Sequence, residues 1–322
     1  MIGYRSPFRI SFVGGGSDIK DFYKYYDGKV FSLTINKYVY ILAHDFFYNK
    51  IQLKYSKTEL VDKINQIEHP IFREVLKKYK VSSLDINSIA DIPSKTGLAS
   101  SSAFTCALIA TLRATLKKKI TNELVAKEAC NIEINKLNNP IGKQDQYGSV
   151  FGGLKKITFL KNEKVKVNNI KLSSNIIKNF ENHICLYYIS DNKNLNQVLT
   201  DMKKNLLNKK DKFQSLKEMT DLVDPFIGNL KKMNFPEMGK ILNINWQLKK
   251  ELSNKISNKN IDDIYNVGIK SGAYGGKLLG SGGGGFMLFL CDPKNQNILD
   301  KGLKKFPRYK INIDFEGLKR FI

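Results

Sequence analysis

The chain has 322 residues, 42% of them hydrophobic, which is enough for two domains with apolar cores. Its net charge of +23 suggests nucleic-acid binding, but only six of the 53 basic residues are arginine, and the lysines are spread along the length as on a solvated surface. No apolar run approaches the roughly 20 residues that span a bilayer, and the N-terminus lacks a signal peptide pattern. We therefore expect a cytoplasmic protein that binds neither membrane nor nucleic acid.

The first half of the chain predicts alternating strands and helices. Strands are expected at residues 7–13, 29–46, 83–93 and 155–160, helices at 69–80, within 94–119 and at 122–137, and a polar loop at 139–154. The helix within 94–119 follows a loop of glycine and serine and ends in lysines, which suit its dipole.

The second half differs in pattern, because a strand at 183–190 precedes a long helical region. That region runs from about Asn194 to Ile269, with breaks near Pro225 and Pro236. A glycine hairpin and a last helix and strand follow. One helical face, expected in the core, comprises Ile241, Ile244, Leu248 and Leu252.

The cysteines and histidines show no spacing typical of a metal site or a disulfide framework. They stand far apart in the sequence: Cys106, Cys130, Cys185, Cys291, His44, His69 and His183. We expect buried thiols and structural or surface histidines.

The stretch LLGSGGGGFMLF contains Gly280, Gly282 and Gly285 at the G-x-G-x-x-G spacing of a dinucleotide-binding loop. That motif requires a helix after the glycines, whereas FMLFL predicts a short buried strand. A tight turn between two strands is therefore expected.

The segment DIPSKTGLASSSAF ends a strand at a proline and opens a helix at residues 100–102. A helix N-terminus has unpaired amides and a partial positive charge, so an anion fits there. The serine hydroxyls either cap the helix or contact phosphate or Mg²⁺. No G-x-x-x-x-G-K-[ST] sequence is present, so this is not a Walker-type loop.

The segment IEINKLNNPIGKQDQYGSVFGG supplies two carboxylates, Glu133 and Asp145. Near a phosphate-binding helix end, one carboxylate can hold Mg²⁺ and another can accept a proton from a substrate hydroxyl. The alternatives are an exposed helical glutamate and a turn-forming aspartate, although the polar neighbours of Asp145 suit a sugar.

The segment SPFRISFVGGGSD places Arg9 on a strand beside a glycine loop whose backbone can approach a ligand closely. Asp18 follows the loop and could accept hydrogen bonds from vicinal hydroxyls. The alternatives are a surface arginine and an aspartate that caps the next helix.

In this order and spacing, the four segments resemble the GHMP kinase family, which includes galactokinase, homoserine kinase and mevalonate kinase. PSKTGLASSSA is similar to the family's phosphate loop P-x-x-x-G-L-G-S-S-A, and RISFVGGGSD with GKQDQYGSVFGG resembles the branch acting on D-glycero-D-manno-heptose 7-phosphate. The resemblance covers nearly the full chain. It implies an α+β fold with a ribosomal-protein-like domain in residues 1–165 and a ferredoxin-like domain in residues 166–322, with the active site between them.

The resemblance also implies roles for individual residues. Asp145 and Arg9 would be catalytic, and Ser101 and Glu133 would hold Mg²⁺. The phosphates of ATP would lie on Lys95, Gly97, Leu98, Ala99, Ser100, Ser101 and Ser102. The substrate would contact Gly14, Gly15, Gly16, Ser17, Asp18, Gly142, Gln144, Gly282 and Gly283. GSGGGG would be a turn that supports the phosphate loop. Ala99 replaces a glycine usual in the family, and this change would affect phosphate binding only if the position needs a positive φ.

The predicted function is an ATP- and Mg²⁺-dependent kinase that phosphorylates the anomeric hydroxyl of heptose 7-phosphate, acting as a monomer or homodimer. One alternative is another sugar kinase of the family, similar to fucokinase or galactokinase. The others are a basic nucleic-acid-binding protein and a degenerate kinase. The joint presence of Arg9, Ser101, Glu133 and Asp145 argues against degeneracy.

Overall fold

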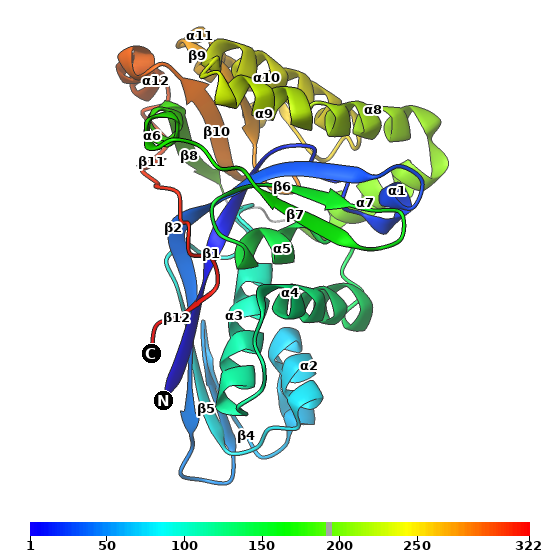
Figure 1. Cartoon of the computed structure of the whole chain (residues 1–322), viewed down its shortest axis with the longest axis vertical. Coiled ribbons are helices and arrows are strands. Elements are labelled where there is room, and N and C mark those ends of the chain that lie inside the picture. Colours follow the sequence, from blue (N-terminus) through cyan, green and yellow to red (C-terminus); the bar gives the residue numbers. More distant parts are fainter. Residues whose placement is uncertain (191–194) are drawn as a thin grey trace.

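The computed structural model describes residues 1–190 and 195–322, which form two sheets and their covering helices (Figure 1). The strands are β1 (Ile2–Val13), β2 (Gly28–Asp45), β3 (Ile51–Lys54), β4 (Thr58–Val61), β5 (Leu84–Ala90), β6 (Leu154–Phe159), β7 (Val165–Asn169), β8 (Ile184–Ser190), β9 (Ala273–Leu278), β10 (Gly285–Cys291), β11 (Arg308–Tyr309) and β12 (Lys319–Arg320). The helices are α1 (Lys20–Tyr23), α2 (Pro70–Tyr79), α3 (Ser100–Thr115), α4 (Asn122–Cys130), α5 (Gln144–Val150), α6 (Ser174–His183), α7 (Leu195–Asn208), α8 (Lys210–Asp221), α9 (Val223–Lys231), α10 (Phe235–Glu251), α11 (Lys259–Lys270) and α12 (Gln296–Gly302), with short turns η1 (Ile64–Gln66), η2 (Asn131–Lys136) and η3 (Pro293–Asn295).

The larger sheet is built on β1 and β2, two long strands that pair antiparallel. Its order is β12-β1-β2-β5-β3-β4, and β6 and β7 extend it from β2. Helix α3 packs against β1 and β2, and Figure 1 shows α2 and α4 beside it. Helix α3 lies between the sheet and other helices, and 11 of its 16 residues are buried, as expected of a helix that is apolar on nearly every side.

The smaller sheet has the order β11-β8-β10-β9 and lies in the second half of the chain. Its strand β10 is buried along its whole length, and helices α10 and α11 pack against β9. Glycines allow the close approach of α10 to this sheet, since a Cβ at Gly275 would lie 2.0 Å from the carbonyl oxygen of Gly239.

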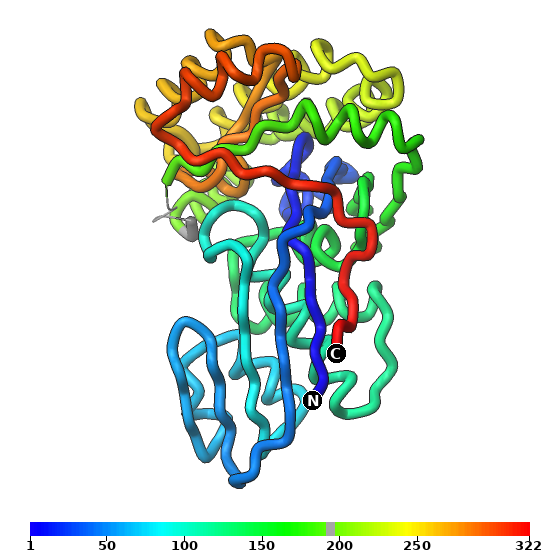
Figure 2. Tube along the Cα trace, turned by 90° about the vertical axis from the view of Figure 1, so that its left-hand side faces the viewer, coloured from blue at the N-terminus to red at the C-terminus, as the bar shows by residue number. Residues whose placement is uncertain are grey.

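The C-terminal segment returns from the smaller sheet to the larger one, and Figure 2 shows the two chain ends close together. There β12 pairs with β1. The predicted boundary at residue 165 falls on the first residue of β7, which still pairs with β6 in the larger sheet. The two-domain division at that residue stays a prediction.

Most predicted elements are present, and two expectations are wrong. Residues 144–150, expected within a polar loop, form helix α5, which buries Tyr147 and Val150 against the larger core. Ile244, expected in the core, is 50% exposed, because the buried face of α10 instead includes Leu242 and Trp246. The expected start of the helical region at Asn194 lies outside the described residues.

The cysteines and histidines have the structural surroundings that the sequence predicts. All four thiols are free and buried. His69 caps α2, where its Nδ1 accepts a hydrogen bond from the backbone of Phe72, and His183 stacks on Phe235. In the described ranges, no helix is both long and apolar enough to cross a bilayer.

Candidate active site

Arg9 and Asp145 form an ion pair where β1 passes the first turn of α5. Arg9 Nε and Nη2 donate to Asp145 Oδ1 at 2.9 and 2.6 Å, and Nη1 donates to the carbonyl of Gly97 at 2.8 Å. The side chain of Arg9 is 3% exposed and that of Asp145 is 25% exposed, so Arg9 is not a surface arginine. Both hydrogen bonds from Arg9 to Asp145 end on Oδ1. Asp145 Oδ2 accepts no hydrogen bond from the described part of the chain, so it can accept one from a ligand.

The loop before α3 leaves the helix N-terminus without a capping side chain. The N-cap is Ala99, in the left-handed region with φ 67°, and the serines that follow do not cap the helix. Gly97 and Lys95 also have positive φ, at 86° and 64°. The backbone N–H groups of the first turn are therefore available to an anion. Lys95 is exposed. Ala99, which replaces the glycine usual in the family, has a positive φ that glycine adopts more easily than alanine.

Glu133 is fully buried and receives three hydrogen bonds, so the alternative of an exposed helical glutamate is wrong. It lies in the π-helical turn η2, which continues α4. Ser101 donates to Oε1 at 2.7 Å, and Ser102 and Gln146 donate to Oε2 at 2.8 and 2.7 Å. Burial raises the pKa of Glu133, while the three hydrogen bonds act against this rise. Ser101 is exposed, and Ser102 is buried.

Asp18 lies behind the glycine loop and does not cap α1, the helix that follows it. Its Oδ1 accepts from the Gly16 amide at 3.1 Å, and its Oδ2 accepts from the Gln144 amide at 3.0 Å. Burial raises the pKa of Asp18 to about 6, the Gln144 amide lowers it, and the charge of Asp145 raises it further. Gly142 must lack a side chain, because a Cβ there would lie 2.0 Å from Asp18 Oδ2.

The other predicted substrate residues of the first half lie around the same point. Ser11 donates to Gln144 Oε1 at 3.1 Å, which links the β1 wall to α5. Ser17 turns inward, where its hydroxyl donates to the carbonyls of Gly14 and Lys29 at 2.8 and 2.9 Å. The structure thus brings the glycine loop, Gln144 and the Arg9–Asp145 pair together. The hydroxyl of Ser17 hydrogen-bonds to backbone carbonyls within the fold.

The glycine hairpin between β9 and β10 packs directly on the phosphate loop. A Cβ at Gly280 would lie 2.5 Å from Gly97 Cα, and one at Gly285 would lie 2.4 Å from the Thr96 carbonyl oxygen. Phe286 also donates its backbone N–H to Thr96 O at 3.2 Å. The hairpin therefore supports the loop through backbone contacts, and β10 follows the glycines as the sequence predicts.

Gly282 and Gly283, predicted to contact substrate, lie against a different neighbour. A Cβ at Gly282 would lie 2.7 Å from Ile256 Cα, and the Gly283 amide donates to Ile256 O at 3.0 Å. Their role in binding substrate stays a prediction.

Two buried lysines near the site were not predicted from the sequence. Lys249 of α10 is 6% exposed and donates to the Gly280 carbonyl. Lys277 of β9 is 2% exposed and donates to the carbonyls of Ser11 and Phe12 at 3.1 and 2.8 Å. The available signal was the position of Lys249 one turn beyond Trp246, on the helical face that also buries Met238 and Leu242.

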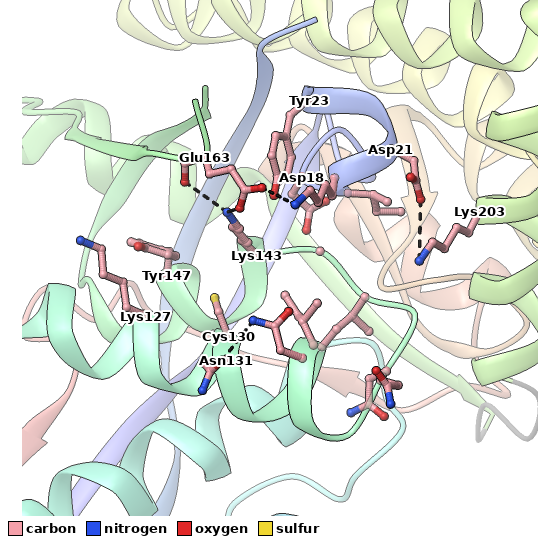
Figure 3. Close-up of a pocket in the computed structure, with 18 residues that line it drawn as sticks. Asp18, Asp21, Tyr23, Lys127, Cys130, Asn131, Lys143, Tyr147, Glu163 and Lys203 are labelled. Atoms are coloured by element: carbon pink, nitrogen blue, oxygen red, sulfur yellow. Dashed lines mark hydrogen bonds and ion pairs between the residues drawn. The ribbon is translucent and has the colours of Figure 1, made fainter. Parts of the chain in front are cut away.

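A pocket of about 460 Å³ lies beside Asp18, with Gly142 and Lys143 in its wall (Figure 3). Neither Arg9 nor Asp145 lines it. Four asparagines contribute to the lining, namely Asn131, Asn135, Asn138 and Asn139. The charged side chains around it are Lys20, Lys127, Lys143, Lys203, Asp18, Asp21 and Glu163. Figure 3 shows Lys143 near Glu163 on one side and the Asp21–Lys203 pair, at 3.7 Å, on the other.

The residues at the α3 terminus fit a magnesium–nucleotide complex. Mg²⁺ prefers oxygen ligands and is bound by one or two carboxylates together with phosphates and water. Glu133 and the Ser101 hydroxyl supply such oxygens within 2.7 Å of each other. Among the described residues no group of three or more His, Cys, Asp and Glu side chains could hold a metal. Phosphate oxygens of a bound nucleotide would supply further ligands.

The fold and this site define a phosphotransferase of the GHMP type. The family model of the GHMP kinases N terminal domain matches residues 65–153, and that of the GHMP kinases C terminal domain matches residues 226–308. Together they match more than half of the chain.

Individual proteins of this class match almost the whole chain. A D-glycero-alpha-D-manno-heptose 7-phosphate kinase from Campylobacter jejuni is 28% identical over 98% of this chain and 97% of its own length. The crystal structure of a D-glycero-D-manno-heptose 1-phosphate kinase from Bacteroides thetaiotaomicron has a TM-score of 0.81 at 21% identity, covering 100% of this chain and 99% of that one. Lactococcus lactis galactokinase, solved with galactose, has a TM-score of 0.75 at 14% identity, covering 99% and 94%.

The chain belongs to the GHMP kinase family, and the predicted GHMP fold and enzyme class, a sugar kinase, are confirmed. Kinases of this family use ATP. The metal, the acceptor and the role of each site residue are proposals.

Proposed function

We propose that this kinase transfers the γ-phosphoryl group of ATP to the anomeric hydroxyl of D-glycero-D-manno-heptose 7-phosphate, giving the 1,7-bisphosphate. The observation that carries the proposal is the free Oδ2 of Asp145. It lies beside Arg9, which contacts the carbonyl of Gly97 in the loop that leads to the uncapped end of α3. A substrate hydroxyl could therefore bind at Asp145 while an anion binds next to it at the N-terminus of α3.

Asp145 would orient the acceptor hydroxyl and take its proton through Oδ2. Arg9 fixes the orientation of Asp145 through two hydrogen bonds, and its charge offsets negative charge on the transferring group. The first-turn amides of α3 would hold phosphate oxygens at a position fixed by the glycine hairpin.

Ser101 and Glu133 would hold Mg²⁺, which when bound supplies positive charge to the phosphates. Ser102 and Gln146 both donate to Oε2 of Glu133, so they fix the carboxylate from its buried side. Such outer contacts orient a metal ligand before the metal arrives.

The choice of acceptor is supported by similarity and by the pocket beside Asp18. The Campylobacter relative is named for heptose 7-phosphate and the Bacteroides one for heptose 1-phosphate, so the two names differ in the position of the substrate phosphate. Asparagine amides suit hydroxyl groups, and the lysines of the pocket suit a phosphate. Asp18 lines this pocket and would accept hydrogen bonds from hydroxyls of the sugar.

A panel of acceptors tests the proposal. The purified chain is given ATP, Mg²⁺ and, separately, heptose 7-phosphate, heptose 1-phosphate, galactose, fucose and mevalonate, and ADP release is measured. We expect turnover with heptose 7-phosphate and a product whose new phosphorus signal couples to the anomeric proton. Turnover with a free hexose while heptose 7-phosphate is inert would overturn this acceptor in favour of a galactokinase- or fucokinase-like activity.

A further inference from the structure

Lys249 is a buried cation from the second half of the chain that lies at the candidate active site. It is on α10, and only 6% of it is exposed. Its ammonium donates to the carbonyl of Gly280, the residue whose Cα faces Gly97 of the phosphate loop. Lys249 therefore lies on the glycine hairpin that packs against the phosphate loop.

The ammonium of Lys249 has donors to spare. It carries three N–H donors, and Gly280 O is the one acceptor it meets among the described residues. A buried ammonium with a single neutral acceptor is poorly compensated for lost hydration. A bound oxyanion could supply a second acceptor for this ammonium.

The charged groups around Lys249 also favour an anion. Arg9 from β1 and Lys277 from β9 are cationic neighbours, and Asp145 from α5 is the carboxylate that acts against them. Burial lowers the pKa of Lys249 to about 7, Arg9 lowers it further, and Asp145 raises it. A phosphoryl group bound beside Lys249 would raise this pKa again and keep the ammonium charged.

We propose that Lys249 is a catalytic residue whose ammonium binds the terminal phosphoryl group of the nucleotide triphosphate during its transfer. The inference rests on the proposed kinase reaction but not on the identity of the acceptor. Lys249 then stabilises charge on the transferring group from the second half of the chain, while Arg9 does so from the first.

A matched control exists in Lys155 of β6. Lys155 is also fully buried, donates to a glycine carbonyl, that of Gly153, at 3.1 Å, and has its pKa lowered by burial to about 7. It contacts neither the phosphate loop nor the glycine hairpin through that bond. The charge of Arg9 acts on Lys155 as it does on Lys249. Lys155→Met therefore reports what the loss of a buried lysine near Arg9 does in general.

The test compares the affinities of ADP and of a non-hydrolysable ATP analogue, each with Mg²⁺, by calorimetry. In Lys249→Met we expect the analogue to bind about tenfold more weakly and ADP to bind within twofold of wild type. Loss of one donor to the transferring group should lower kcat about 10²-fold. Lys155→Met should leave both affinities and kcat near wild type.

A second variant, Lys249→Gln, separates charge from support of the hairpin, because its amide can still donate to Gly280. We expect it to bind the analogue as weakly as Lys249→Met. Wild-type affinity for the analogue in Lys249→Gln, or equal weakening of ADP and analogue in Lys249→Met, would overturn the proposal and assign Lys249 to structure. Neither binding measurement needs an acceptor, so failure of heptose 7-phosphate as substrate would be seen separately.

Discussion

In the first half of the chain the candidate site consists of charged and hydroxyl side chains, whereas the second half contributes mostly glycine backbone. Arg9 donates hydrogen bonds to Asp145, and Ser101 and Gln146 donate to Glu133. Gly280 and Gly285 instead touch the phosphate loop at distances that leave no room for a Cβ. Chemistry and close packing are thus divided between the two halves, and the buried ammonium of Lys249 is an exception to that division.

Mutations in these two regions of the site, the charged side chains of the first half and the glycine hairpin of the second, should have different effects. Substitutions in the first region should change turnover or metal use while the fold persists, because each removes one functional group. Substitutions in the hairpin should change stability and the position of the phosphate loop together, because backbone contacts have no spare volume.

The largest effect is expected for Asp145→Asn. The amide oxygen can still accept from Arg9, but the side chain no longer takes a proton, so kcat should fall by about 10²-fold or more. ADP release with heptose 7-phosphate is the measurement, and circular dichroism checks folding. Wild-type turnover in this variant would remove Asp145 from its role.

Asp18→Asn should change the pH dependence of stability. The folded-state pKa of about 6 lies above the ordinary aspartate value of 3.8, so the folded chain holds this proton more tightly. Stability from this group is present below pH about 4 and is lost as the pH rises through about 6. Urea unfolding from pH 4 to 7 should show the wild type losing up to about 3 kcal/mol relative to Asp18→Asn. Parallel pH profiles would contradict the assignment.

Gly280→Ala tests the backbone contact of the second region. Its φ is 72°, and the new Cβ would meet Gly97, so we expect a loss of about 2 kcal/mol in unfolding free energy and weaker binding of ATP. Gly228→Ala in α9 is the control, because its Cβ meets no atom within 4 Å and alanine favours a helix. Equal stability of the two variants would show that the hairpin does not press on the loop.

Ser101→Ala and Ser102→Ala separate metal binding from support of Glu133. Both hydroxyls donate to that carboxylate, but Ser101 is exposed and Ser102 is buried. We expect Ser101→Ala to raise the Mg²⁺ concentration for half-maximal activity about tenfold, and Ser102→Ala to lower stability by about 1 kcal/mol. The same Mg²⁺ requirement in Ser101→Ala and wild type would exclude Ser101 as a ligand.

The smallest effect is expected for Ala99→Gly. Alanine at φ 67° is strained by about 1 kcal/mol, and glycine would relieve this strain. The greater conformational freedom of glycine in the unfolded chain offsets part of that gain in stability. Thermal unfolding should show a small rise in midpoint without loss of activity. A fall in midpoint would mean that the Ala99 methyl group contributes packing that outweighs the strain.

The sequence predicted those parts of the site that short, directional patterns encode. The strand–loop–helix at the serines and the hairpin followed by a strand are local, so residue types and spacing were sufficient to predict them. The roles of Glu133 and Asp145 came from the resemblance to the GHMP kinase family and stay proposals. Helix α5 was missed because Asp145, Gly148 and Ser149 have low helix propensity, and packing of Tyr147 against the core stabilises it. The position of Lys249 one turn beyond Trp246 was too weak a signal to separate it from the many surface lysines, because its burial depends on contacts with residues far away in the sequence.

The central claim is that Asp145, Glu133 and the N-terminus of α3 meet around one triphosphate and its metal. A crystal structure of the chain with Mg²⁺ and a non-hydrolysable ATP analogue tests it most directly. We predict phosphate oxygens within hydrogen-bonding distance of the first-turn amides of α3, a metal bound by Glu133 and Ser101, and the terminal phosphate facing Asp145. A nucleotide bound elsewhere, with these three groups contacting none of it, would contradict the account.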